Sequence, residues 1–401
     1  MKILHVLYQS LPNSKGSSIR SRDIMAAQSQ SGLTPIVISS PFQQGWGVDA
    51  VESFSGVRYY RTYNARPEQV VSESRRSIFQ KILKLLQIFE FSWRVYRVAK
   101  SERVSVIHAH AMFFCGFSGW AASRVLGIPF VYELRSLWEE RPNQTAKFLD
   151  KIVARCARFL ETCVMRMADR VVVINKNLYK EVVARGIAVS KVAIVENAVD
   201  IFRVDSYDNE CTQRTGNDLV IGYVGSVSPI EGLDLLLDAI YRLQQRGCSN
   251  PFVIYGDGPA LADLKGRAHH LHLKNVSFKG AFSPEDVADV YKEIDIVVNP
   301  RKRSHLTDAV TPLKPLEAMA FRKLVVVSNI GGMTELVEDE QTGFLFEADN
   351  VVSLADTLFN VINSYQAQSG VISKGRVYVE SQRSWLSNGK RYADIYRALV
   401  S

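Results

Sequence analysis

Three basic side chains lie close together in the C-terminal half of the chain, where a predicted strand ends and a helix begins. Arg301 and Lys302 directly follow the apolar run 295–300, which is typical of a buried parallel strand. The segment 311–315, Thr-Pro-Leu-Lys-Pro, predicts a helix start with Lys314 in its first turn. Because a cation is unfavourable at the positive end of a helix, we expect a bound anion, such as a phosphate group, beside Lys314.

A second polar turn follows the next predicted strand. Residues 323–328 form an apolar run, and Gly331, Gly332 and Glu335 come after it. The carboxyl ends of parallel strands meet at one edge of a sheet, so these residues and the three cations are expected to converge. We interpret the arrangement as a binding site for a nucleotide diphosphate. The alternative is an ordinary α/β repeat whose loop charges are solvated.

Two histidines end a predicted strand in the N-terminal half. The strand is expected over 104–108, so that His108 and His110 lie at its carboxyl end, where open α/β sheets bind ligands. We interpret the two rings as pointing to opposite sides of the extended segment, which argues against their chelating one metal ion together. One ring is then expected to pack in the core while the other reaches the ligand. A purely structural role is the alternative.

Charged residues also follow the neighbouring predicted strand and the first one. Glu133 and Arg135 are two apart at the end of the strand 130–133, so they share one face and either pair with each other or bind acceptor hydroxyls. After the first strand, Gly16 lets the backbone approach a ligand closely, and Arg20 follows in a predicted helix. The alternative for this arginine is a solvated helix start.

Two alternating series of strands and helices must position these residues. Such alternation predicts a parallel, doubly wound α/β sheet in each half, hence two Rossmann-like domains. The first series has strands predicted at 3–7, 35–39, 58–61, 104–108, 130–133 and 170–174, and helices at 18–31, 77–100, 114–126, 146–167 and 177–185. After a polar linker at 205–218, the second has strands at 220–224, 252–255, 276–278, 295–299 and 323–328, and a final helix is predicted at 386–399.

The composition is that of a soluble globular chain, with 401 residues, 47% of them hydrophobic and 22% charged. No apolar run in the sequence approaches the ~20 residues that span a bilayer. The five cysteines lack the spacing of metal ligands, which suits a reducing cytoplasm. The net charge of +8 favours an anionic partner. Nucleic acid is disfavoured, because the cations cluster at strand ends without interleaved aromatic residues.

The segment 75–103 leaves two interpretations open. It holds eight basic and two acidic residues together with Trp93, and such a helix can lie on an anionic membrane beside a lipid-linked acceptor. At 100° per residue, however, the cations form no single face, which favours a buried helix with solvated ends. We therefore expect a cytoplasmic protein, with peripheral contact on the inner face of the plasma membrane as the alternative.

The block around Lys314 resembles a known family. Thr311-Pro-Leu-Lys-Pro-Leu-Glu-Ala-Met-Ala320, then Gly331-Gly332 with Glu335, then Thr342-Gly-Phe-Leu345 are similar to the donor site of the retaining GT-B glycosyltransferases of family 4. The similarity runs from residue 1 to about residue 400. It implies two Rossmann-like domains facing a cleft: an acceptor domain at 1–200, with the helix 385–401 packed back onto it, and a donor domain at 201–384.

The resemblance implies transfer of a sugar, with retention, from a nucleotide-diphosphate sugar to a hydroxyl group. The acceptor would be a saccharide or a lipid-linked saccharide, as in surface polysaccharide or glycolipid assembly. The sequence contains no Asp-x-Asp motif to hold a divalent ion, and no two carboxylates are placed as nucleophile and acid. We therefore expect neither a metal nor another cofactor, and same-face attack assisted by the departing phosphate.

The resemblance also assigns roles to single residues. It places Glu317 at the ribose hydroxyls of the donor and His110 near the transferred sugar. The catalytic residues are expected to be His110, Lys314 and Arg301. Donor binding is expected to involve Gly16, Gly225, Ser226, Gly256, Lys302, Thr311, Pro312, Leu313, Glu317 and Glu335, and acceptor binding to involve Arg20, Glu133 and Arg135.

Three positions depart from the family pattern. Ser226 and Glu231 stand where the family usually has an arginine and a lysine that grip the diphosphate, and Ala309 stands where it has the first of two paired glutamates. We expect cations at the neighbouring strand end, drawn from Arg301, Lys302 and Lys314, to replace the missing pair. Two alternatives stay open: a catalytically silent GT-B protein that acts as a partner or regulator, and a GT-B sugar-nucleotide epimerase.

Overall fold

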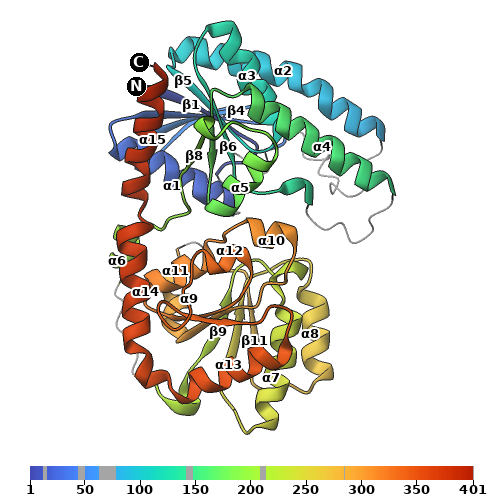
Figure 1. Ribbon diagram of the computed structural model, residues 1–401, viewed down its shortest axis with the longest axis vertical. Coiled ribbons are helices and arrows are strands. Elements are labelled where there is room, and N and C mark those ends of the chain that lie inside the picture. The colour runs from blue at the N-terminus through green and yellow to red at the C-terminus, as the bar shows by residue number, and fades with distance from the viewer. Residues whose placement is uncertain are drawn as a thin grey trace. The chain divides into compact units, whose positions relative to one another are not determined.

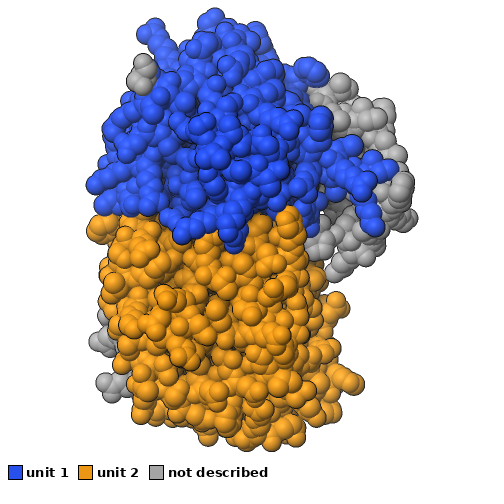
Figure 2. Space-filling model, viewed as in Figure 1, with its two compact units in different colours: residues 1–196, 385–401 blue, residues 197–384 orange. Residues whose placement is uncertain are grey.

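The computed structural model describes residues 1–11, 16–43, 50–62, 78–140, 148–207, 214–283 and 285–400, without the side chains of 78–86 and 148–150. The first residues of the helices predicted from 77 and 146, and the middle of the predicted linker, lie outside the described residues. The chain divides into two compact units (Figure 2). Unit 1 comprises residues 1–196 and 385–401, and unit 2 comprises residues 197–384.

Unit 1 is built on an eight-stranded sheet with the order β3-β4-β2-β1-β5-β6-β7-β8. Neighbouring strands are parallel, except that β3 and β4 pair antiparallel. Every residue of the central strands β5 and β6 is buried, as expected for a parallel sheet covered on both faces. The strands are β1 (Lys2–Leu7), β2 (Thr34–Ser39), β3 (Val51–Phe54), β4 (Val57–Arg61), β5 (Val106–His110), β6 (Phe130–Leu134), β7 (Arg170–Val173) and β8 (Val192–Ile194).

Helices cover both faces of this sheet (Figure 1). On one face His108 of β5 bonds to Tyr396 of the last helix, and on the other Ala109 lies against Gly119 of α3. A Cβ at Gly389 would lie 2.3 Å from the Ala27 carbonyl, so this glycine lets the last helix pack tightly on α1. The helices are α1 (Gly16–Gln30), α2 (Ile78–Glu102), α3 (Phe113–Leu126), α4 (Phe148–Met167), α5 (Lys176–Ala184) and α15 (Trp385–Val400).

Unit 2 is built on a six-stranded, wholly parallel sheet with the order β11-β10-β9-β12-β13-β14. The strands are β9 (Ile221–Val224), β10 (Phe252–Tyr255), β11 (Val276–Gly280), β12 (Ile296–Asn299), β13 (Leu324–Ser328) and β14 (Phe344–Phe346). The helices are α6 (Ile201–Asp205), α7 (Leu233–Gln245), α8 (Leu261–His270), α9 (Val287–Glu293), α10 (His305–Ala309), α11 (Lys314–Ala320), α12 (Gly331–Thr334), α13 (Val351–Asn363) and α14 (Ser369–Gln382).

Alternate strand residues of unit 2 supply two separate cores. Val298 of β12 and Val326 of β13 belong to the core under α7 and α13, whereas Val297 belongs to the core that holds Leu316 of α11. Burial on both faces explains why these strands appear in the sequence as continuous apolar runs. The predicted doubly wound α/β fold with two Rossmann-like domains is thereby confirmed.

The structure corrects several predicted elements. Strand β5 begins and ends two residues later than predicted, so His110 lies within the strand rather than beyond it. The short strands β3, β8 and β14 were not predicted, because three or four residues at the edge of a sheet leave little periodic signal. Among the described residues, no helix is long and apolar enough to cross a membrane.

Candidate functional site

In unit 2, two cations share one carboxylate at the carboxyl ends of the strands. Lys314 is the first residue of α11, and its Nζ lies 2.8 Å from Oε2 of Glu231. Arg301, two residues after β12, places its Nε 3.9 Å from the same oxygen. The side chains of Lys314, Glu231 and Arg301 are only 16%, 8% and 9% exposed. The carboxylate that replaces the family's usual lysine is thus the direct partner of Lys314.

The path of the Lys314 side chain depends on Tyr223 of β9 and on Gly225, which directly follows that strand. A Cβ at Gly225 would lie 2.3 Å from Cε of Lys314, and the φ of this glycine is +143°. Nζ of Lys314 sits 4.6 Å from the centroid of the Tyr223 ring and also donates to its hydroxyl. That hydroxyl donates in turn to the backbone carbonyl of Ser226, 2.6 Å away. The lysine side chain therefore runs through a narrow channel between Gly225 and Tyr223.

Burial and charge act against each other in this group. Burial lowers the pKa of Lys314, and the nearby Glu231 opposes that shift. Burial alone would raise the pKa of the Glu231 carboxyl, but Lys314 and Arg301 together hold it below its usual range. The Glu231 carboxyl is therefore ionised at neutral pH. A buried pair of this kind holds each partner in a narrow range of positions.

The glycines around this group let three loops meet. A Cβ at Gly256 would lie 1.8 Å from the Gly225 carbonyl, and one at Gly232 would lie 1.9 Å from the Pro300 carbonyl. Both glycines also have positive φ values, +134° and +70°. The loops after β9, β10 and β12 thus approach one another more closely than side chains would permit.

Several other residues predicted to bind the donor also belong to unit 2. Thr311 is buried and accepts a hydrogen bond through its carbonyl from Asn197 at 2.7 Å. Lys302 pairs instead with Asp234, at 2.6 Å. Pro312, Leu313, Glu317 and Glu335 are all partly exposed. Whether these residues bind a donor stays a prediction.

In unit 1, buried polar side chains of β1, β5, β6, α1 and α15, together with Arg135 directly after β6, form a closed ring of contacts. Nδ1 of His5 lies 2.9 Å from Nε2 of His110, and Nε2 of His5 lies 2.8 Å from the Gln28 side-chain oxygen. The Gln28 amide donates to the Tyr396 hydroxyl at 2.9 Å, and that hydroxyl lies 2.7 Å from Nδ1 of His108. Glu133 and Arg135 then close the ring between His108 and His110.

The donor and the acceptor of each hydrogen bond around His110 and His5 can be assigned. Arg135 can only donate, so Nδ1 of His110 accepts and the ring proton of a neutral His110 is on Nε2. His5 therefore accepts on Nδ1 and donates from Nε2 to Gln28, which agrees with the oxygen found there. Burial lowers the pKa of His5, His108 and His110, so all three rings are neutral at pH 7. Both ring nitrogens of His110 are consequently in use.

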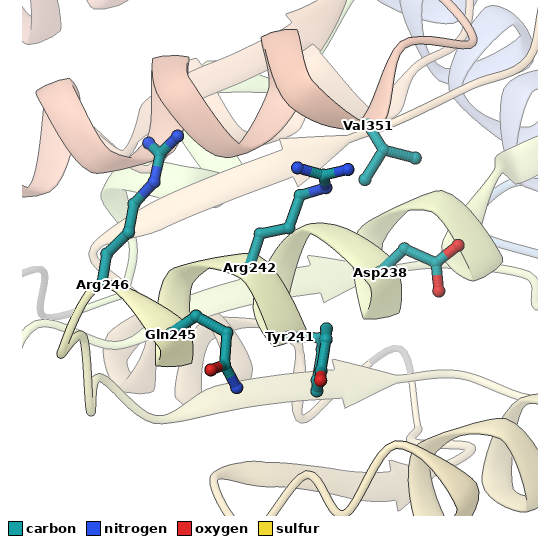
Figure 3. A pocket seen from close by; sticks show the side chains of 6 residues that line it. All are labelled: Asp238, Tyr241, Arg242, Gln245, Arg246 and Val351. Carbon is teal, nitrogen blue, oxygen red and sulfur yellow. The ribbon is translucent and has the colours of Figure 1, made fainter.

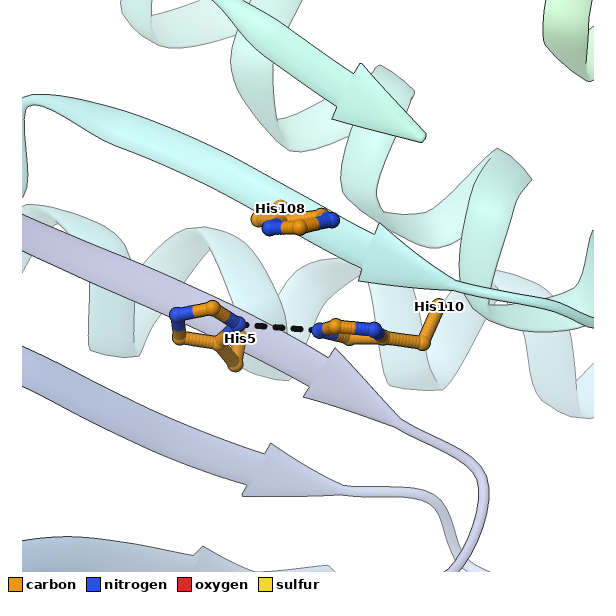
Figure 4. Close-up of side chains that lie close together, drawn as sticks. All are labelled: His5, His108 and His110. Carbon is orange, nitrogen blue, oxygen red and sulfur yellow. Dashed lines mark hydrogen bonds between the residues drawn. The ribbon is translucent and has the colours of Figure 1, made fainter. Parts of the chain in front are cut away.

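The predicted orientation of the two strand histidines is wrong. The rings of His108 and His110 stack on the same side of β5 with their centroids 4.3 Å apart (Figure 4), because side chains two apart in a strand point the same way. With His5 they form the group of described residues that could hold a metal ion. Both nitrogens of His5 and of His110, however, already bond to protein groups, and Nδ1 of His108 lies 2.7 Å from the Tyr396 hydroxyl. The arrangement favours a hydrogen-bonded network over a metal site.

The residues predicted to bind the acceptor also belong to this network. Oε1 of Glu133 accepts from Arg135 at 2.7 Å and from Arg20 at 3.2 Å, and Oε2 accepts from Tyr392 at 2.7 Å. Glu133 has no exposed surface. Burial alone would raise the pKa of its carboxyl, but Arg135 and the other partners hold the pKa well below its usual range. The predicted pairing of Glu133 with Arg135 is confirmed, whereas direct acceptor contact would require the network to open.

Arg135 also supports the first turn of α1. Its guanidinium donates to the Ser21 hydroxyl at 2.8 Å and to the Ser17 carbonyl at 3.3 Å. Gly16 is the exposed first residue of that helix. His5, Gln28, Tyr392 and Tyr396 carry no sequence signal of a site, although the spacing of the two tyrosines by four residues places them on one helix face.

Figure 3 shows a pocket of about 570 Å³ that lies elsewhere in unit 2. It is lined by residues of α7, by Arg246 directly after that helix and by Val351 at the start of α13, and it contains none of the predicted site residues. One of its cations, Arg246, pairs with Asp356 at 2.5 Å and lies over the Phe359 ring. We assign this pocket no role in the chemistry.

Comparisons with known proteins agree with the two-unit architecture. A family model described as Glycosyltransferase Family 4 matches residues 43–203, and one described as Glycosyl transferases group 1 matches residues 218–364. Among relatives, the alpha-D-kanosaminyltransferase of Streptomyces kanamyceticus is 25% identical over 307 residues, covering 73% of this chain and 77% of that protein. The phosphatidylinositol N-acetylglucosaminyltransferase GPI3 subunit of Saccharomyces cerevisiae is 24% identical over 75% of this chain, which spans 64% of that subunit.

Solved structures share the fold. Anabaena HepE in complex with UDP matches with a TM-score of 0.71 and 16% identity, covering 100% of both chains. Identity at this level shows the fold alone. The two family models identify the chain as a member of the group 1, family 4 glycosyltransferases, and its fold is GT-B.

Proposed function

We propose that this protein transfers a sugar from a nucleotide-diphosphate sugar to a hydroxyl acceptor, with retention at the anomeric carbon. The observation that carries the proposal is the pair of cations, Lys314 and Arg301, around Glu231 at the strand ends of unit 2. Negative charge grows on the departing diphosphate as the bond to the sugar breaks. Cations fixed in a water-poor site stabilise that charge without reorganising.

Unit 2 binds the donor in this proposal. Lys314 and Arg301 contact the diphosphate, and Glu317, one helical turn after Lys314, holds the ribose hydroxyls. HepE, which was crystallised with UDP, supports a nucleoside diphosphate as the shared part of the donor. The positive charge comes from side chains, so the reaction needs neither a divalent ion nor another cofactor.

The acceptor oxygen attacks the face from which the diphosphate leaves. The bond between the anomeric carbon and the phosphate oxygen breaks first, and the departing phosphate takes the proton of the attacking hydroxyl. A double displacement would instead need an accessible carboxylate as nucleophile. Glu133, the acidic residue predicted beside the acceptor, is fully buried and already bonded to Arg135, Arg20 and Tyr392.

The acceptor is a saccharide, and we favour a lipid-linked one in glycolipid or surface polysaccharide assembly. The GPI3 subunit named for phosphatidylinositol is one support. Another is helix α2, on which Phe89 and Trp93 are 75% and 60% exposed, one turn apart, with exposed Arg97 and Lys100 beyond them. Aromatic residues beside cations suit the surface of an anionic membrane. Unit 1 would then contact the cytoplasmic membrane face peripherally.

Thermal unfolding with a panel of ligands tests the donor assignment. UDP, GDP, dTDP and ADP, and one sugar nucleotide of each, are added to the wild type, to Lys314→Ala and to Lys265→Ala, which alters an exposed cation of α8. A ligand that binds the folded state raises the midpoint. We expect the ligands that carry one particular nucleotide base to raise the unfolding midpoint of the wild type and of Lys265→Ala. The same ligands should leave the midpoint of Lys314→Ala unchanged. No rise with any ligand would instead favour the catalytically silent alternative.

A further inference from the structure

We propose that Glu231 is a positioning residue that holds Lys314 where the donor diphosphate binds. This inference rests on the proposed function, and it adds a role for an acidic residue at a place where an anion has to be bound. The turn after β9 carries no cation of its own between Gly225 and Gly232. Glu231 recruits one from α11 instead, through the contact of 2.8 Å with Nζ of Lys314.

Residues of β9 and of the turn after it leave space for the Lys314 side chain, which comes from α11. Gly225 leaves open the space through which the lysine methylenes run, since a Cβ there would lie 2.3 Å from Cε. The Tyr223 ring lies below the ammonium group at 4.6 Å. A lysine has several rotatable bonds and loses considerable entropy when it is held in one conformation. A carboxylate at the end of the channel supplies the charge-assisted hydrogen bond that fixes it there.

The pairing leaves positive charge available for a ligand. One oxygen of Glu231 serves both Lys314, at 2.8 Å, and Arg301, at 3.9 Å. One carboxylate cannot fully neutralise two cations. A diphosphate that reaches this group therefore meets two cations that Glu231 already holds in place.

A purely structural ion pair would behave differently from a positioning one. Loss of a structural pair lowers stability and leaves the donor kinetics of the folded protein unchanged. Loss of a positioning carboxylate removes a negative charge from an anion site, so ligand affinity stays the same or rises. The lysine is then free to move, and a displacement of about 1 Å can reduce the rate on the order of 100-fold. A fall in kcat without a rise in Kd is therefore the diagnostic pattern.

The experiment uses the full chain and four variants. They are Glu231→Gln, Lys314→Glu, the reversed pair Glu231→Lys with Lys314→Glu, and the control Asp238→Asn, which removes a carboxylate of α7 that pairs with Arg267 at 2.6 Å. Calorimetry with UDP, GDP, dTDP and ADP gives Kd. Release of the nucleoside diphosphate from UDP-glucose, GDP-mannose, dTDP-glucose and ADP-glucose gives kcat.

We expect Glu231→Gln to bind the preferred nucleoside diphosphate at least as tightly as the wild type, with kcat lowered on the order of 100-fold. Asp238→Asn should match the wild type in both quantities. The reversed pair should recover at least about 10-fold in kcat over Lys314→Glu alone, because a glutamate suits the first turn of α11 and the cation returns to the same place. If Glu231→Gln does not fold, the role of Glu231 is tested by the kcat of the reversed pair, which keeps both charges, relative to that of Lys314→Glu.

The outcomes separate this inference from the proposed function. Binding and donor cleavage by the wild type, with an unchanged kcat in Glu231→Gln, would overturn the role of Glu231 and leave the transferase standing. A failure of the reversed pair to exceed Lys314→Glu would also overturn it. Absence of binding by the wild type to all four nucleoside diphosphates would overturn both.

Discussion

Tyr392 of the last helix donates a hydrogen bond of 2.7 Å to Oε2 of Glu133, a carboxylate that ends a strand early in the chain. Both side chains are fully buried. One turn further along α15, Tyr396 joins the same network through Gln28 and His108. The C-terminal helix is therefore part of the polar centre of unit 1, which explains why residues 385–401 belong to that unit.

Replacing Tyr396 by phenylalanine should destabilise the protein without changing its shape. The substitution leaves the Gln28 amide and Nδ1 of His108 buried without a partner, at a cost of about 1–3 kcal/mol. Urea unfolding followed by circular dichroism measures the difference. The matched control is Tyr241→Phe, at a tyrosine of α7 that is 42% exposed. Equal stabilities of the two variants would contradict the ring of hydrogen bonds.

Replacing Glu133 by glutamine should be more costly. Arg20 and Arg135 would then be buried beside each other without their counter-charge, and breaking a buried ion pair in this way costs about 3–5 kcal/mol. Glu90→Gln serves as the comparison, because its pair with Arg94 on α2 is largely exposed and worth about 0.5 kcal/mol or less. The decrease in unfolding free energy relative to the wild type, measured in the same buffer, should be several-fold larger for Glu133→Gln than for Glu90→Gln. Similar losses would disprove the assigned role of Glu133.

The sequence predicts much of the frame, because buried parallel strands appear as continuous apolar runs and polar residues follow them. That reasoning places Lys314 at a helix start and offers the pairing of Glu133 with Arg135 as one of two interpretations, and the structure has both features. It does not find His5, because a histidine inside the apolar run of β1 carries no signal of its partners. The contact of Lys314 with Glu231 joins strand ends that only the sheet order brings together.

The error over the two strand histidines has a simple cause. Residues two apart in a strand share a face, so His108 and His110 had to point the same way. The consequence reaches further than orientation: the two rings, with His5, form one buried network instead of one packed ring and one exposed ring. His110 as a catalytic residue stays a prediction, and its occupied nitrogens favour a positioning role.

Glu161 should make stability depend on pH. Burial raises the pKa of its carboxyl to about 7, although Tyr132, Trp138 and the backbone N–H of Phe113 donate to it. The folded state then keeps a proton that the unfolded chain has already lost, so stability falls as the pH rises from the unfolded pKa, near 4.5, to about 7. The loss is on the order of 3 kcal/mol.

Comparison with Glu161→Gln isolates this contribution, since the other titrating groups are common to both proteins. The unfolding free energy of the wild type minus that of the variant should decrease between pH 5 and pH 7 and become constant at higher pH. Chemical unfolding at half-unit pH steps measures it. A difference that stays constant, or that grows with pH, would show that the carboxyl is ionised throughout this range.

Gly225→Ala should weaken donor binding, because the added methyl group displaces the side chain of Lys314. The new methyl group would lie 2.3 Å from Cε of Lys314, at a backbone φ of +143° that an alanine adopts only with strain. The lysine must leave its channel, so we expect the Kd for the preferred nucleoside diphosphate to rise about 10-fold, as for loss of one charge-assisted contact. Gly266→Ala is the control, because its Cβ would meet open space within α8. Calorimetry of both variants decides the matter: an unchanged Kd in Gly225→Ala would mean that Lys314 does not contact the diphosphate from this channel.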